Sequence, residues 1–208
     1  DLEHLGAMHA WEEARERYER LFDAHPQVIA CDMHPEYLAS KWAREYAHEH
    51  GLPLIEVQHH HAHIASVLGE NELHGPVIGI ALDGTGYGTD GTIWGGEILI
   101  ATRRDFKRFW HLPSFALPGG AAAILNPERT AYALLKAYGE RDDAFFGQFA
   151  LDNPQFAPFL EHLENRALLD QMIDKGLNTP MCSSAGRLFD AVSALLGICA
   201  HPGYDGEA

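Results

Sequence analysis

Two short apolar runs, each followed by a segment with helical spacing, constrain the fold of this chain more than any other feature. The runs cover residues 28–31 and 54–57, and the helices after them are predicted to run from Pro35 to Gly51 and onward from His59. Proline suits the first position of a helix, because its missing N–H has no helical partner there. Alternating strands and helices are typical of parallel strand pairs, with functional residues at the carboxyl ends of the strands. The first part of the chain is therefore predicted to be α/β.

The rest of the chain is predicted to hold an antiparallel meander followed by helices. Residues 77–82, 92–100 and 106–112 have strand patterns, and the glycines of residues 84–91 predict a turn after the first of them. Residues 113–127 contain several prolines and glycines and are interpreted as a loop. Helical spacing predicts further helices at residues 8–22, 127–138, roughly 159–175 and 185–196.

Composition excludes several functional classes. The 30 acidic and 15 basic residues give a formal net charge of −15, which argues against nucleic-acid binding, because neutralising phosphates requires a basic surface. No apolar run approaches the roughly 18 residues that a membrane span needs. The three cysteines are far apart and lack C-x-x-C spacing. A reducing, cytoplasmic location is therefore expected.

A histidine cluster at residues 59–63 is the strongest indication of chemistry. His59 and His63 are four residues apart, so on a helix their imidazoles share one face and could hold one cation. Asp83, directly after the apolar run 77–82, would add a carboxylate, and this donor set suits iron or zinc. The alternatives are surface histidines at a polar helix start and an ordinary Asp-Gly turn. His60 points elsewhere on the helix and is interpreted as a contact to a metal ligand or to the substrate.

The glycines after this apolar run predict a close approach of the backbone to phosphate. Gly84, Gly86 and Gly88 would let backbone N–H groups reach phosphate oxygens, and Thr85 would add a hydroxyl. The stretch lacks the lysine of a P-loop, and hairpin glycines are the alternative. The Cys-Ser-Ser segment that ends at Ser184 suggests a nucleophile, but no base is placed beside it. Ser184 is therefore interpreted as the N-cap of the last helix.

Several sequence strings together resemble the HypF carbamoyltransferases of nickel–iron hydrogenase maturation. The resemblance is to part of their C-terminal domain, which is similar to the universal tRNA threonylcarbamoyl-transfer protein, and it spans nearly the whole chain. The strings are V-Q-H-H-H-A-H-I-A-S at residues 57–66, D-G-T-G-Y-G at 83–88, D-G-T-I-W-G-G-E at 90–97, S-A-G-R-L-F-D at 184–190 and D-M-H-P-E-Y-L at 32–38.

The resemblance implies actin-like, ribonuclease-H-like lobes with mixed sheets and a nucleotide in the cleft, incomplete in a chain of this length. Residues 1–75 would be the C-terminal part of the first lobe, and residues 76–208 the start of the second lobe with a helical insertion. His59, His63 and Asp83 would hold a divalent metal, and a late aspartate beyond the C-terminus would complete the site. The implied nucleotide contacts are Gly84, Thr85, Gly86, Tyr87, Gly186, Asp190 and Glu207.

The activity that the resemblance implies uses carbamoyl phosphate and ATP, and it passes through carbamoyl-adenylate. The carbamoyl group would be delivered to the C-terminal cysteine of HypE, toward the cyanide ligands of the hydrogenase. Two alternatives stay open: an O-carbamoyltransferase that acts on a sugar hydroxyl, and a non-catalytic metal-binding assembly module. Ala121 and Glu128 depart from the acidic residue and the P-W-R string expected there. The regions that make the adenylate would precede Asp1, so activity of this segment alone is not expected.

Overall fold

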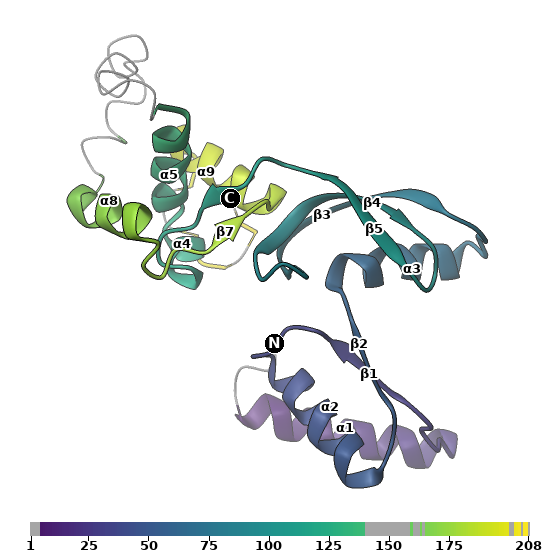
Figure 1. Cartoon of the computed structure of the whole chain (residues 1–208). Coiled ribbons are helices and arrows are strands. Elements are labelled where there is room, and N and C mark those ends of the chain that lie inside the picture. The colour runs from purple at the N-terminus through teal and green to yellow at the C-terminus, as the bar shows by residue number, and fades with distance from the viewer. Residues whose placement is uncertain are drawn as a thin grey trace. The chain divides into compact units, whose positions relative to one another are not determined.

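The structure of the chain is a computed structural model that describes residues 5–139, 159, 163, 165–199, 202–204 and 206–207. The chain divides into two compact units, residues 1–62 and 63–208, whose elements are labelled in Figure 1. The dividing point lies inside helix α3 (His59–Glu70), so this continuous helix gives its first turn to one unit and the rest to the other. The lobe boundary at residue 75 stays a prediction. Among the helices that the structure describes, none qualifies as a candidate membrane span.

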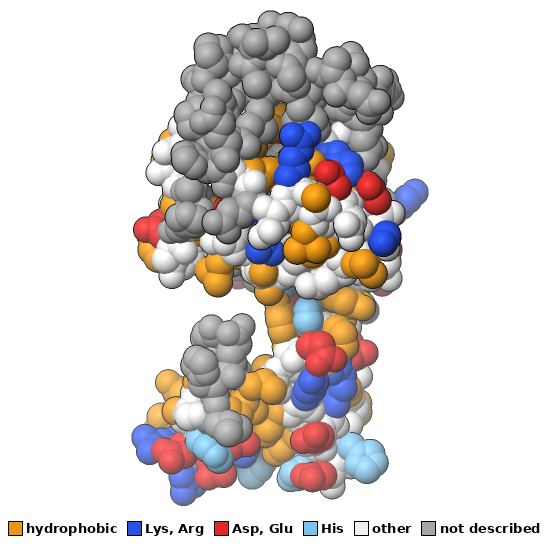
Figure 2. Space-filling model, turned by 90° about the vertical axis from the view of Figure 1, so that its left-hand side faces the viewer, with side chains coloured by type: hydrophobic (Ala, Val, Ile, Leu, Met, Phe, Trp, Pro, Cys, Tyr) orange, Lys and Arg blue, Asp and Glu red, His pale blue; other side chains and the backbone are white. Residues whose placement is uncertain are grey.

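The first unit is built on a two-stranded parallel sheet. Its elements before α3 are α1 (Leu5–Phe22), β1 (Ile29–Asp32), α2 (Leu38–His50) and β2 (Leu54–Val57). β1 and β2 pair in parallel, with Ile29 opposite Leu54, which confirms the predicted pairing. Helix α2 contacts both strands, and it buries Ala43 and Ala47. Charged and histidine side chains cover much of the face of this unit that Figure 2 presents.

Helix α2 begins later than was predicted from the position of Pro35. The expected start was Pro35, but α2 begins at Leu38. Two side chains hold the intervening residues in a turn. Asp32 Oδ1 accepts the N–H of His34 at 2.7 Å, and His34 Nδ1 accepts the N–H of Glu36 at 3.1 Å. These local side-chain bonds compete with helical ones, so the proline lies in the turn and not at the first helical position.

The second unit begins with the predicted antiparallel meander of β3 (Val77–Tyr87), β4 (Ile93–Ala101) and β5 (Phe106–His111). Helix α3 packs against this sheet, as Figure 1 shows, and its Ile64 and Leu68 join a core with Ala81 and Leu99. Burying each of the larger side chains, those of Ile64, Leu68 and Leu99, contributes about 1.5–3 kcal/mol. At Gly79 of β3, an added Cβ would lie 2.3 Å from the Ile64 side chain. This glycine therefore lets the helix lie close to the strand.

The predicted glycine turn is partly wrong. β3 does not end at Asp83 but continues to Tyr87, and its register against β4 shifts between Leu82 and Gly86. The turn itself is shorter and covers residues 88–91, where Gly88 N–H donates to the carbonyl of residue 92 at 2.9 Å. Strand pairing uses only backbone groups, so a glycine run pairs well when the neighbouring strand is placed beside it. The shift leaves residues 83–85 as an irregular stretch within a long strand.

The C-terminal part is mainly helical, with small strands that extend the sheet. Its described elements are β6 (Phe115–Ala116), α4 (Ala121–Leu125), α5 (Pro127–Gly139), α8 (Arg166–Lys175), β7 (Met181–Cys182) and α9 (Ala185–Leu195). The predicted loop at residues 113–127 is therefore wrong in part, because β6 and α4 lie within it. β7 was not predicted; it runs parallel to β4 and antiparallel to β6. The helix expected from about residue 159 is described from Arg166 onward, and residues 160–162 and 164 lie outside the described residues. The chain is thus a mixed α/β protein with a mixed sheet.

Candidate metal and nucleotide site

Gln58 fixes the first turn of α3. Its side-chain oxygen Oε1 accepts the N–H of His61 at 2.9 Å, which is the contact of an N-cap side chain. Its amide nitrogen Nε2 lies 3.0 Å from Nδ1 of His60. His60 is fully buried, and its ring lies edge-on to the ring of His59 at a centroid distance of 5.5 Å. His60 thus contacts a predicted ligand, while its functional role stays a prediction.

His59 and His63 lie one helical turn apart on α3. The Nδ1 atom of His59 is 2.7 Å from Oδ2 of Asp32, the last residue of β1, whereas His63 is exposed. Asp83 lies on β3, against which α3 is packed, and its Oδ1 accepts the N–H of Gly84 at 2.7 Å. Helical spacing and the packing of α3 on the sheet are therefore what bring the three predicted ligands together.

The donor atoms of this group are close enough for one metal ion. One ligand atom from each of His59, His63 and Asp83 lies within 4.8 Å of the others. Ligand atoms bound at about 2 Å from zinc lie roughly 3–4 Å apart, so small side-chain rotations would place all three around one ion. Two imidazoles and one carboxylate with open coordination positions are typical of catalytic zinc and of non-haem iron. The donor set fits a divalent metal, and the metal assignment itself stays a prediction.

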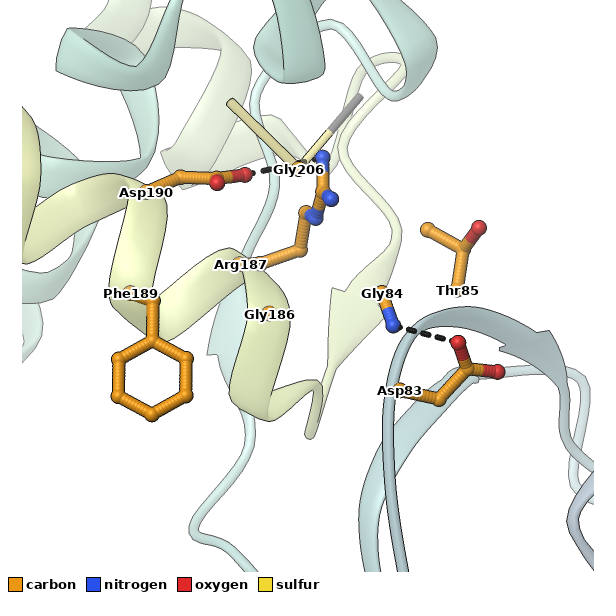
Figure 3. A pocket seen from close by; sticks show the side chains of 8 residues that line it. All are labelled: Asp83, Gly84, Thr85, Gly186, Arg187, Phe189, Asp190 and Gly206. Carbon is orange, nitrogen blue, oxygen red and sulfur yellow. Dashed lines mark hydrogen bonds and ion pairs between the residues drawn. The ribbon is translucent and has the colours of Figure 1, made fainter. Parts of the chain in front are cut away.

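A pocket of about 340 Å³ lies between β3 and the N-terminal half of α9. Figure 3 shows its lining side chains, with Asp83 and Thr85 on the strand side and Arg187 on the helix side. Arg187 is almost completely buried, and its guanidinium Nη1 pairs with Asp190 Oδ2 at 2.9 Å. The lining residues are Asp83, Gly84, Thr85, Gly186, Arg187, Phe189, Asp190 and Gly206.

The backbones of α9 and β3 touch at the edge of this pocket. A Cβ added at Gly186 would lie 2.8 Å from Cα of Gly84, so no larger residue fits without a shift. Ser184 spans the contact, because its Oγ lies 2.7 Å from the carbonyl oxygen of Asp83 and 2.6 Å from that of Gly84. The same Oγ accepts the N–H of Arg187 at 3.1 Å. The predicted N-cap role of Ser184 is therefore confirmed, and this residue also ties the helix to the strand.

The predicted nucleotide residues divide into two groups. Four of them line the pocket: Gly84, Thr85, Gly186 and Asp190. The other three do not. Gly86 and Tyr87 pair with β4, and Glu207 accepts a hydrogen bond from the N–H of Gly203 through Oε2. The assignment of nucleotide contacts stays a prediction for all seven.

Arg187 and Phe189 line the pocket but were not among the predicted contacts. The signal for Arg187 was present in the sequence, because it precedes Asp190 by three residues and thus shares its helix face. A guanidinium beside the N-terminus of an eleven-residue helix makes this wall attractive to an anion. Asp83 and Asp190 add carboxyl groups to the lining, so the attraction to an anion is limited to this wall.

A buried ionic network supports the segment before α9. Glu97 of β4 is completely buried, and it accepts hydrogen bonds from Arg108 Nε at 2.7 Å and from Ser183 Oγ at 2.5 Å. Burial alone would raise the pKa of Glu97, but the bonds from Arg108 and Ser183 outweigh it and lower that pKa below its usual value. Arg108 also pairs with Asp90 at 2.9 Å and lies 3.9 Å over the ring of Trp94. This network holds β4, β5 and the start of α9 together.

Cys182 precedes this segment and is fully buried. Burial raises the pKa of its thiol to about 11, so the thiol stays protonated near neutral pH. A thiolate is the nucleophilic form of cysteine. The structure therefore gives no support to Cys182 as a nucleophile.

Comparison with known proteins assigns both units to one family. Residues 79–208 match a family model described as "Carbamoyltransferase, Kae1-like Domain, second subdomain", and residues 1–70 match "HypF Kae1-like domain". The chain is 43% identical to "Carbamoyltransferase HypF" of Rhodobacter capsulatus, covering 99% of this chain and 27% of that protein. It is 40% identical to "Carbamoyltransferase HypF2" of Cupriavidus necator, covering 100% of this chain and 24% of that protein. The chain thus spans about a quarter of the length of these two curated relatives.

Solved structures agree with the sequence comparison. The chain resembles full-length HypF in its phosphate- and nucleotide-bound form with a TM-score of 0.86 and 41% identity, covering 99% of this chain and 30% of that one. It resembles HypF of T. kodakarensis with a TM-score of 0.84 and 36% identity, covering 100% of this chain and 27% of that one. The predicted fold class is confirmed by these matches.

Proposed function

This chain belongs to the HypF carbamoyltransferases, and we propose that it provides a metal and nucleotide site for moving a carbamoyl group from carbamoyl-adenylate to the C-terminal cysteine of HypE. One observation supports this function above all others. Asp83 is one of the three clustered candidate ligands, and it also lines the pocket between β3 and α9. A metal at this carboxylate would therefore lie at the wall of the pocket, beside a ligand bound there.

The pocket would bind the adenylate through its phosphate. Thr85 and Arg187 both belong to its lining and offer a hydroxyl and a guanidinium, and the N-terminus of α9 adds a positive partial charge. Asp190 would hold the guanidinium in place through their 2.9 Å ion pair. Fixed donors of this kind stabilise negative charge that develops on the leaving phosphate, without any reorganisation during the reaction.

His59, His63 and Asp83 would hold the metal, for which iron and zinc are the candidates. When bound, such an ion supplies Lewis-acid polarisation of an oxygen atom of the ligand. The task of these residues is to place that charge, and the continuous helix α3 holds the two imidazoles at a fixed spacing. His60 would support the arrangement from its buried position beside the ring of His59.

The nucleophile in this proposal comes from the acceptor. A thiolate of HypE would attack the carbamoyl carbon, a C–S bond would form, and the bond to the phosphate oxygen would break with release of AMP. The buried thiol of Cys182, whose pKa is raised to about 11, does not compete for this role. In this proposal the chain only positions and stabilises the reacting groups. That role agrees with a site made of metal ligands and hydrogen-bond donors.

Two substitutions with one control test the metal assignment. Asp83→Ala and His63→Ala should each reduce the bound zinc or iron of the purified chain to background, measured by elemental analysis after dialysis. His74→Ala is the control, because His74 is an exposed histidine elsewhere in the same unit; this variant should keep its metal. Unchanged metal content in Asp83→Ala would contradict the assignment.

Transfer is tested in a chimera in which this chain replaces the matching segment of the Rhodobacter capsulatus relative. With carbamoyl phosphate, ATP and HypE, mass spectrometry should find the carbamoyl group on the C-terminal cysteine. Asp83→Ala should slow this step by about 100-fold or more, as removal of a preorganised electrostatic group does. Transfer to a sugar hydroxyl instead would favour an O-carbamoyltransferase. Metal binding without any binding of ATP would favour an assembly module.

A further inference from the structure

Asp32 holds the ring of His59 from a position 27 residues earlier in the chain. Its side chain is mostly buried, with 20% exposed, and its Oδ2 lies 2.7 Å from Nδ1 of His59. The other oxygen, Oδ1, accepts the N–H of His34 at 2.7 Å. Each oxygen of this carboxylate therefore has its own partner, one in the backbone of a turn and one in a side chain at the start of α3.

The parallel strand pair explains this contact. Asp32 ends β1 directly opposite Val57, which ends β2, and α3 begins two residues after Val57. The carbonyl of Asp32 also accepts a hydrogen bond from Ser40 Oγ of α2 at 2.8 Å, so its backbone is anchored. The carboxylate thus lies at the carboxyl end of one strand, where the first residue of the helix that follows the neighbouring strand can reach it.

An aspartate in this position selects one form of the imidazole. An ionised carboxylate only accepts hydrogen bonds, so it favours the tautomer of His59 that carries its proton on Nδ1. In that tautomer the lone pair lies on Nε2, which is the form that ligates a metal through Nε2. A carboxylate behind a metal-binding histidine fixes both its ring orientation and its tautomer, and losing such a partner commonly weakens metal binding by about 10–100-fold.

We propose that Asp32 is a positioning residue that holds His59 in the Nδ1–H tautomer, with Nε2 directed to bind a divalent metal. This inference rests on the proposed metal site at His59, His63 and Asp83. It adds a residue of β1 to that site, which is otherwise built from α3 and β3. The competing explanation is structural: Asp32 would serve only to close the turn at His34.

Asp32→Asn separates the two explanations. The amide oxygen of asparagine can still accept the N–H of His34, so the turn is kept. Its amide nitrogen would replace Oδ2, and because it donates, Nδ1 of His59 would have to accept and the proton would move to Nε2. We expect zinc affinity to fall about 10–100-fold in this variant, measured by competition with a chromophoric chelator. Nitrogen-15 NMR of the imidazoles should show the change of tautomer without metal.

The control is Glu56→Gln. The carboxylate of Glu56 belongs to the same unit, but it pairs with Arg44 and not with a histidine. This variant should bind zinc like the original chain. If Asp32→Asn binds zinc normally while His63→Ala does not, the role of Asp32 is overturned and the metal site stands. If His59 keeps its Nδ1–H tautomer in Asp32→Asn, the role is likewise overturned. If the original chain binds neither zinc nor iron, both proposals fail together.

Discussion

The junction between β3 and α9 is built from touching backbones, whereas the first turn of α3 is built from side chains that reach one another. At the junction, Gly186 lies so close to Gly84 that a Cβ added at Gly186 would not fit without a shift. In contrast, His59 in the first turn of α3 contacts Asp32 of β1 through a single hydrogen bond, and both side chains are partly exposed. The proposed function uses both regions. We therefore expect substitutions at the junction to lower the free energy of unfolding, and substitutions around the first turn of α3 to weaken metal binding.

Arg108→Ala should have the largest effect on stability, because it leaves the completely buried carboxylate of Glu97 without its cationic partner. Removing one member of a buried ion pair costs about 3–5 kcal/mol in the free energy of unfolding. Urea unfolding followed by circular dichroism measures this loss. Lys107→Ala, at an exposed position of the same strand, should change stability by less than about 0.5 kcal/mol. Similar values for the two variants would show that the network does not stabilise the junction.

The same ion pair predicts that the free energy of unfolding decreases at acid pH. The pKa of Glu97 is lowered in the folded chain from an ordinary value of 4.5, so the unfolded state takes up a proton first as the pH falls. The stabilisation is complete above about pH 4.5 and is lost as the pH falls through the lower folded pKa. Urea unfolding measured at a series of pH values that falls from above 4.5 should show a steeper loss in the free energy of unfolding than in Glu97→Gln. Equal slopes would contradict an ionised Glu97.

Gly186→Ala should have an intermediate effect on the free energy of unfolding. The new methyl group would lie 2.8 Å from the backbone of Gly84, and the strain should outweigh the gain in helix propensity, for a net loss of about 1–2 kcal/mol. Gly69→Ala is the matched control, since Gly69 is also helical but has open space around it. The free energy of unfolding of that variant should increase by up to about 1 kcal/mol. A stabilised Gly186→Ala would mean that the junction is loose.

Ser184→Ala should cost about 1 kcal/mol, because it removes an N-cap from α9. The same hydroxyl reaches the carbonyls of β3, so nucleotide binding to the pocket should weaken as well. Isothermal calorimetry with ATP and urea unfolding would separate the two effects. Ser114→Ala, at an exposed serine, should leave both unchanged. An intact nucleotide affinity in Ser184→Ala would limit this residue to capping.

His63→Ala should have the smallest effect on stability. The side chain is exposed on α3, and surface substitutions usually change the free energy of unfolding by less than about 0.5 kcal/mol. Metal-free protein should therefore unfold at the same urea concentration with and without this histidine. A loss of more than about 1 kcal/mol would place His63 among the structural residues and remove the contrast between the two regions.

Much of this fold could be predicted from the sequence, and the failures have physical causes. The helices α5 and α9 were predicted because their apolar residues recur at helical spacing, and β4 was predicted because it is rich in β-branched and aliphatic residues. The strands β6 and β7 have two residues each, which is too short for any period to show. β3 extends through glycines because β4 lies beside it. That pairing depends on tertiary structure, and the glycines alone favour a turn.

The site was predicted to the extent that its chemistry lies in local spacing. His59 and His63 are four residues apart, so their shared helix face could be predicted directly. Arg187 was missed because an arginine in an amphipathic helix ordinarily faces solvent, whereas here its side chain is buried and paired with Asp190. The contact of Asp32 with His59 was missed because it spans 27 residues. Only the parallel register of β1 and β2 brings those two side chains together.

The position of Trp94 beneath Arg108 gives the chain an optical reporter. All four tryptophans lie in the described residues, and Trp94 is the one that is buried, at 1% exposure. Its indole N–H donates to Asp90 at 2.9 Å, so both its face and its edge are in contact with charged groups. Its emission should lie to the blue of Trp11, Trp42 and Trp110, and should shift whenever the guanidinium moves. Fluorescence of a variant that retains only Trp94 would therefore report, in real time, whether ligand binding at the pocket disturbs the strands behind it.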